Sequence, residues 1–188
     1  MQIFPPLRLA LLNGGLLLTA YFLGLVLTVL TFPKEKRQQL FFEPRYPRED
    51  PRWWILALGR LSAVSLVVLM FFTPLRLGTP FSIVGLVTYV AGYSTVVLSL
   101  LEYNRAPAGL PVTEGLYGLS RNPQWIGLVL VFFGASLVVG SWLHVVLLVI
   151  LVVAYHFQIL LEEEACLRLY GDKYASYMDR VPRYLVFI

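Results

Sequence analysis

Residues 125–161 read WIGLVLVFFGASLVVGSWLHVVLLVILVVAYHFQILL, and this stretch contains no Asp, Glu, Lys or Arg. A helix needs about 20 apolar residues to cross roughly 30 Å of hydrocarbon, so the stretch is too long for one ordinary crossing. Gly140 and Ser141 lie near its middle, and glycine is a strong signal for a break in a helix. We therefore expect two short antiparallel membrane helices joined at this dipeptide.

Three further apolar stretches precede this pair, at residues 9–32, 53–72 and 81–101. Each is long enough to span a bilayer. The first is too long for the core of a signal peptide, and no small-residue cleavage site follows it. The sequence therefore predicts an all-α, multi-pass membrane protein with about five spans.

The composition also indicates a membrane protein. Of the 188 residues, 58% are hydrophobic and 14% are charged, whereas soluble domains carry about 25% charged residues. The single cysteine, Cys166, excludes a disulfide framework or a Cys-rich metal site. His144 and His156 stand apart in apolar runs, so we expect no metal site, which would need several convergent donors. The net charge of +4 favours attraction to anionic lipids over nucleic-acid binding.

The basic residues predict how the chain is oriented. In a five-span arrangement, the loop 33–52, the segment between the third and fourth spans, and the tail all fall on one face and are all basic. The opposite face has only Arg8 and Arg76. Because basic loops stay on the cytosolic side, we expect the N-terminus outside and the C-terminus in the cytosol.

Residues 102–123 form a polar segment with three prolines and three glycines, which predicts irregular backbone at the membrane interface. Pro123 suits the first turn of the next helix. Arg121 and Asn122 would then lie at the start of that helix, where free N–H groups favour an anion. In the simpler alternative, Asn122 is an ordinary N-cap and Arg121 an ordinary interfacial anchor.

Glu162, Glu163 and Glu164 follow the last span directly. Successive helical residues are rotated by about 100°, so one face cannot hold all three side chains, and we expect Glu164 to be solvated. Beyond them, large side chains recur at a spacing of three and four residues, which predicts an interfacial amphipathic helix with Gly171 as its weak point. These side chains are Leu169, Tyr170, Tyr174, Tyr177 and Val181.

Several short motifs follow one another in residues 109–182. They are Gly115-Leu116-Tyr117, Arg121-Asn122-Pro123, Trp125, Gly127, the Gly140-Ser141 break, Glu162-Glu163, and Tyr170-Gly171-Asp172-Lys173-Tyr174 with Tyr177. In this order and spacing, the set resembles the isoprenylcysteine carboxyl methyltransferase and phospholipid methyltransferase superfamily of integral membrane enzymes. Three positions depart from the superfamily pattern, because Asn122 replaces a commoner His, Trp125 a commoner Tyr and Cys166 a commoner Leu.

The resemblance implies that S-adenosylmethionine binds in a cytosol-facing pocket formed by the last helices and the tail, and leaves as S-adenosylhomocysteine. An arginine at a helix N-terminus would suit the carboxylate of this cofactor, and aromatic faces would suit its sulfonium. Arg121 and Asn122 would be the catalytic residues. The implied cofactor-binding residues are Leu110, Pro111, Val112, Tyr117, Arg121, Asn122, Trp125, Glu162 and Glu163.

The implied function is methyl transfer to a lipophilic acceptor at the cytosolic face of the cell membrane. A lipid amine, a prenylcysteine carboxylate, and a small lipophilic thiol or phenol are all open as acceptors. Arg121 or Arg60 would orient an acidic group of the acceptor. Arg60 lies within the second span, where it could instead snorkel toward headgroups.

The whole chain, 1–188, would be a single membrane domain. Residues 1–101 would supply three spans and the basic loop, and residues 102–188 the cofactor-binding loop, the helical hairpin and the tail. The alternatives are an NADPH-dependent reductase of the sterol type and a non-enzymatic membrane scaffold. A scaffold has no need of such a polar set beside lipid. The expected partners are membrane lipids, and the sequence does not indicate an oligomeric state.

Overall fold

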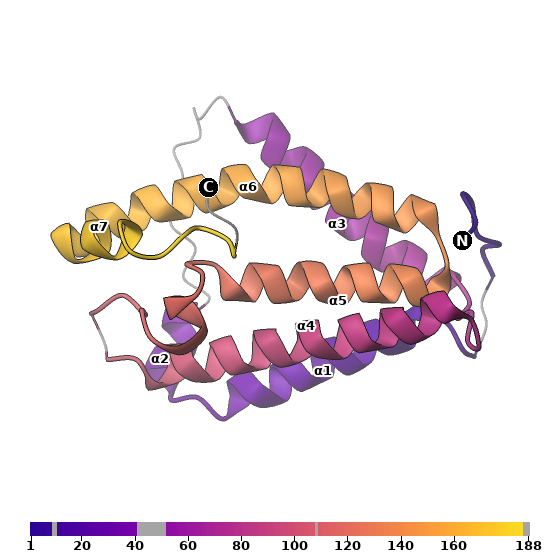
Figure 1. Ribbon diagram of the computed structural model, residues 1–188, viewed down its shortest axis with the longest axis horizontal. Coiled ribbons are helices and arrows are strands. Elements are labelled where there is room, and N and C mark those ends of the chain that lie inside the picture. Colours follow the sequence, from indigo (N-terminus) through magenta and orange to yellow (C-terminus); the bar gives the residue numbers. More distant parts are fainter. Residues whose placement is uncertain (9–10, 41–51, 108, 186–188) are drawn as a thin grey trace.

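The computed structural model describes residues 1–8, 11–40, 52–107 and 109–185, and its regular elements within these ranges are all helical (Figure 1). In chain order they are α1 (Gly14–Leu30), α2 (Lys34–Leu40), α3 (Trp53–Phe72), α4 (Pro80–Arg105), the 3-10 helix η1 (Gly115–Gly118), α5 (Pro123–Val139), α6 (Trp142–Tyr170) and α7 (Asp172–Met178). The prediction of an all-α protein is confirmed. The predicted basic loop begins with α2, and its residues 41–51 lie outside the described ranges.

Five apolar helices correspond in position to the five expected spans. By length and composition, α3, α4 and α6 can each cross a membrane, whereas α1 and α5 are apolar but shorter. Each of these two has 17 residues, and a helix of that length covers only about 25 Å. The multi-pass character is confirmed, while the count of five spans and the orientation of the termini stay predictions.

The expected break between α5 and α6 is present. Gly140 has φ +67°, in the left-handed region, and the Ser141 side chain accepts a hydrogen bond from the His144 backbone N–H at 3.4 Å. The prediction of two short helices is wrong for α6, which has 29 residues. This helix continues through the three glutamates because only helix-compatible residues follow them, and it ends at Gly171, the expected weak point.

The two arms of this hairpin pack mainly against other helices. Helix α5 lies along α4, whereas α6 packs against α3, which crosses it obliquely (Figure 1). The α4–α5 contact depends on two glycine pairs. A Cβ atom on Gly92 would lie 2.7 Å from the Gly127 carbonyl oxygen, and one on Gly85 would lie 2.7 Å from the Gly134 carbonyl oxygen. Small residues allow such close backbone contact in membranes, and here they set the α5 N-terminus beside the α4 C-terminus.

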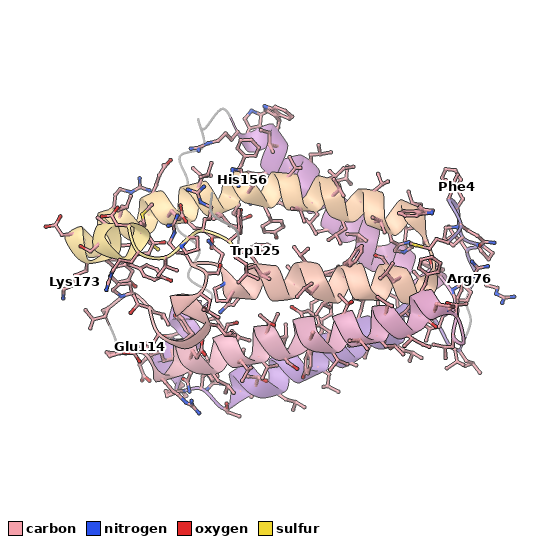
Figure 2. All side chains as sticks on the ribbon, in the orientation of Figure 1. Phe4, Arg76, Glu114, Trp125, His156 and Lys173 are labelled. Atoms are coloured by element: carbon pink, nitrogen blue, oxygen red, sulfur yellow. The ribbon has the colours of Figure 1, made fainter. Side chains whose placement is uncertain are left out.

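The bundle has two chemically different ends. Figure 2 shows Phe4 and Arg76 at one end, and Glu114 and Lys173 at the other. At the first end, the N-terminal segment pairs with the α5–α6 turn, since the Gln2 N–H donates to the Gly140 carbonyl at 2.7 Å. At the second end, η1, the α5 N-terminus and α7 come together, and this is where the polar motifs gather.

Candidate functional site

A polar cavity of about 270 Å³ lies at this second end of the bundle. Its walls come from η1, the α5 N-terminus, the last turns of α6, and α7. All the predicted cofactor residues except one contribute to its lining: Pro111, Val112, Tyr117, Arg121, Asn122, Trp125, Glu162 and Glu163. The exception is Leu110, whose side chain lies outside the lining and is 38% exposed.

The cavity also has walls that the sequence did not assign to the site. These residues are Leu40, Tyr103, Pro123, Gln124, Cys166, Tyr170, Tyr174 and Tyr177. The tyrosines of the tail are marked by their regular spacing, which predicts an interfacial amphipathic helix and not a cavity wall. Tyr174 and Tyr177 instead face the protein, where both are buried. Tyr103 and Leu40 come from distant helices, and no local pattern marks them.

A buried ion pair joins the Arg121-Asn122-Pro123 motif to the Glu162-Glu163 motif. Arg121 Nε donates to Glu163 Oε1 at 2.9 Å, and the side chains are only 7% and 6% exposed. Arg121 Nη1 also donates to the carbonyl oxygens of Met178 at 3.0 Å and Val181 at 2.7 Å. Arg121 is therefore an internal connector, not the solvated interfacial anchor of the simpler alternative.

A second arginine, missed by the sequence analysis, completes this cluster. Arg183 donates to Glu163 Oε2 from Nε at 3.0 Å and from Nη2 at 2.8 Å. The hydrogen bonds to this carboxylate raise the pKa of the Arg183 guanidinium. Two guanidinium groups share one carboxylate, so the cluster keeps one net positive charge beside the cavity.

Asn122 occupies the N-cap position of α5, but its side chain does not cap the helix. Its Nδ2 donates instead to the Arg183 carbonyl oxygen at 3.2 Å, and Ser120 Oγ donates to the same oxygen at 2.9 Å. The Arg121 backbone N–H donates to the Pro182 carbonyl at 3.0 Å. The start of α5 therefore binds the chain that follows α7.

The three consecutive glutamates point in different directions, as expected. Glu163 is buried, whereas the Glu164 side chain is 51% exposed. Its Oε1 lies 3.8 Å from Arg52 Nη1. Glu162 lines the polar cavity and accepts a hydrogen bond from Gln158 Nε2 at 2.9 Å. The expectation that Glu164 is solvated is confirmed.

The 3-10 helix η1 is fixed from two sides. The Leu116 backbone N–H donates to Glu102 Oε2 at 2.9 Å, and Tyr177 Oη donates to the Tyr117 carbonyl at 2.7 Å. Gly115 has φ +62°, and a Cβ atom there would collide with the Glu102 carboxylate. Burial raises the pKa of Tyr117 and of Tyr177, so both phenols stay neutral and act as hydrogen-bonding groups.

An apolar cavity of about 990 Å³ adjoins the polar one. It lies among α1, α2, α4, α5 and α6, and its apolar walls include Tyr21, Leu25, Val29, Leu100 and Leu128. Among the described residues that line it, Arg37 is the sole lysine or arginine. The two cavities share Leu40, Tyr103, Gln124, Trp125, Glu162 and Cys166.

Arg60 is placed apart from both cavities. It is exposed on α3 and contributes to neither lining. The preceding residue, Gly59, packs α3 against α6, where a Cβ atom would lie 2.5 Å from Ala154 Cβ. The assignment of Arg60 to the acceptor stays an untested prediction without support from this geometry.

The sequence profile of the phospholipid methyltransferases matches residues 74–173, more than half of the chain. The chain belongs to the phospholipid methyltransferase family. No curated protein and no solved structure matches it significantly. The matched region runs from α4 into α7 and holds most of the cavity lining, whereas Arg183 lies beyond it. The expected superfamily is confirmed.

Membership of the phospholipid methyltransferase family indicates a membrane methyltransferase. It favours this activity over the reductase and scaffold alternatives. The apolar helices agree with it, because at least three of them are long enough to cross a membrane.

Proposed function

We propose that the protein uses S-adenosylmethionine to methylate a lipophilic acceptor at the cytosolic face of the cell membrane. The observation that carries this proposal is the junction of a polar cavity with an apolar one through six shared residues. A water-soluble cofactor and a lipid-soluble acceptor can meet at such a junction, since the cofactor stays in the polar cavity and the acceptor in the apolar one.

The residues of the polar cavity fit the cofactor. The net positive charge of the Arg121, Glu163 and Arg183 cluster suits an α-carboxylate. Glu162 suits ribose hydroxyls or an ammonium group as an acceptor of hydrogen bonds. The aromatic rings of Tyr117 and Trp125 suit a sulfonium. The cavity is near the lower end of the usual range for ligand sites, about 300 Å³, and it continues into the apolar cavity.

When bound, the cofactor supplies an electrophilic methyl group. The contribution of the protein is then to position the acceptor and to exclude water. Glu162 lines both cavities, so its carboxylate can accept a hydrogen bond from the N–H group of an amine acceptor. A carboxylate acceptor needs no base. The neutral phenol of Tyr177 donates a hydrogen bond to the Tyr117 carbonyl and forms part of the cavity wall.

The apolar cavity suits the hydrocarbon part of the acceptor. Its single cation among the described residues, Arg37, can pair with a phosphate or carboxylate. This assigns to Arg37 the role that Arg60 had in the sequence analysis. It also favours an acceptor with an acidic group over a neutral thiol or phenol.

The test is calorimetry on the purified protein in lipid nanodiscs, together with methyl transfer from radiolabelled S-adenosylmethionine in membranes. We expect S-adenosylhomocysteine to bind, NADPH not to bind, and the label to enter the lipid fraction. Glu162→Gln should weaken the binding of S-adenosylhomocysteine. Binding of NADPH alone would support a reductase, and binding of neither compound would support a scaffold.

A further inference from the structure

We propose that Glu163 does not contact the cofactor and is instead a positioning residue. With Arg121 and Arg183, it would form a latch that fastens α7 and the following residues over the polar cavity. This deepens the proposed function, on which it rests, because it separates the roles of two consecutive glutamates. Glu162 is then the carboxylate that faces bound molecules.

Both carboxylate oxygens of Glu163 are already engaged. Oε1 accepts from Arg121, and Oε2 accepts twice from Arg183, with all three distances between 2.8 and 3.0 Å. The side chain is 6% exposed. Three of the roughly four lone-pair positions of this carboxylate are therefore used by two guanidinium groups. A ligand that displaced either arginine would break a buried, charge-assisted bond, which is costly.

The same arginine side chain holds the end of α7. Arg121 Nη1 donates to the carbonyl of Met178, the last residue of α7, and to that of Val181. A cation suits the Met178 carbonyl because the last turn of a helix leaves its carbonyls without intrahelical partners. Arg183, five residues after the end of α7, binds the Glu163 carboxylate and so holds the segment that follows this helix.

The latch controls a wall of the cavity. Helix α7 supplies Tyr174 and Tyr177, and both line the polar cavity. Tyr177 reaches across to the Tyr117 carbonyl of η1. If the latch opens, these rings lose their support, so a bound cofactor should dissociate faster.

Glu162 is placed differently. It lines both cavities, whereas Glu163 lines the polar one alone, and it accepts a hydrogen bond from Gln158, one turn earlier on α6. Since consecutive helical residues are rotated by about 100°, Glu163 can point toward the tail while Glu162 points into the cavities.

The experiment compares variants of the full chain in nanodiscs by amide hydrogen exchange without ligand and by the affinity for S-adenosylhomocysteine. We expect Arg183→Ala and Glu163→Gln each to raise exchange in residues 172–185 about tenfold. Both variants should bind S-adenosylhomocysteine more weakly because it dissociates faster. Both should also raise the KM for S-adenosylmethionine with little change in kcat. Arg183→Lys, which keeps a donor for Oε2, should restore most of the affinity.

Two further variants separate a latch from a general loss of stability. Arg180→Ala is the matched control, because Arg180 is exposed and donates to the Ser176 carbonyl within its own turn. It should change neither measurement. Glu162→Gln should weaken the binding of S-adenosylhomocysteine without changing amide hydrogen exchange in the tail. The double variant Arg183→Ala with Glu163→Gln should raise exchange no further than either single change.

The latch proposal is wrong if Glu163→Gln leaves amide hydrogen exchange in the tail unchanged and weakens the binding of S-adenosylhomocysteine as much as Glu162→Gln does. It is equally wrong if Arg180→Ala and Arg183→Ala have the same effect. The exchange measurement needs no cofactor. If the unaltered protein fails to bind S-adenosylhomocysteine, the proposed function fails, and exchange still decides whether the latch exists.

Discussion

Trp125 of α5 lies against Tyr155 of α6, with ring centroids 3.6 Å apart and planes inclined by 48°. Trp125 lines the polar cavity and the apolar cavity, and also an apolar groove of about 680 Å³ between α5 and α6. Tyr155 lines this groove as well. The ring of Trp125 thus occupies the place where three spaces meet.

Trp125→Ala should impair methyl transfer by joining these spaces. The change removes an aromatic contact worth about 1 kcal/mol and leaves the acceptor poorly positioned. We expect the KM for the acceptor to rise about tenfold, with a smaller loss in the affinity for S-adenosylhomocysteine. Trp125→Tyr, which keeps an aromatic face, should retain most of the activity. Equal loss in both variants would contradict this role.

Leu25→Trp should block the acceptor and spare the cofactor. Leu25 is half-buried and lines the apolar cavity, so a larger side chain would fill the space assigned to hydrocarbon. We expect methyl transfer to fall at least about tenfold while the calorimetric affinity for S-adenosylhomocysteine is unchanged. Leu23→Trp is the control, since Leu23 is exposed on the same helix and outside the lining. Full activity of Leu25→Trp would exclude this cavity as the acceptor site.

Arg37→Ala should raise the KM for an acidic acceptor and leave the cofactor affinity intact. A guanidinium that pairs with a phosphate or carboxylate contributes about 1.5–3 kcal/mol, so we expect a rise of at least about tenfold. Lys34→Ala is a matched control, because Lys34 lies on the same short helix but outside the cavity lining. If both variants raised the KM equally, general attraction of α2 to the membrane would explain the effect and contradict the role of Arg37.

Gly92→Ala should destabilise the bundle. The new Cβ atom would lie 2.6 Å from the Val131 backbone nitrogen, so α4 and α5 would have to separate. Such overpacking costs about 1–3 kcal/mol and should lower the Tm in nanodiscs by several degrees. Gly118→Ala makes the same chemical change where the new atom would meet only the Thr113 carbonyl at 3.6 Å. Its Tm should stay the same, and a similar fall in both variants would contradict the glycine contact.

The amino-acid sequence determined the features that depend on local chemistry. Long apolar runs without charge show which segments are helices in or near lipid, and Gly140 and Gly171 mark where helices end. The ordered motifs of the C-terminal half also located the residues of one cavity. This worked because helix propensity, burial in lipid and motif spacing are properties of neighbouring residues.

Only the tertiary structure decided how these helices pair and which side chains meet. Leu110 has the position that the superfamily pattern assigns to the cofactor but is not part of the cavity lining, and Arg60 has the intramembrane position of a functional residue but lies outside both cavities. Arg183 looked like one more basic residue of the tail. Its contact with Glu163 joins segments 20 residues apart. Sequence spacing limited how many of the three glutamates could point inward, but the rotation of α6 and the path of the tail decided that Glu163 meets the arginines.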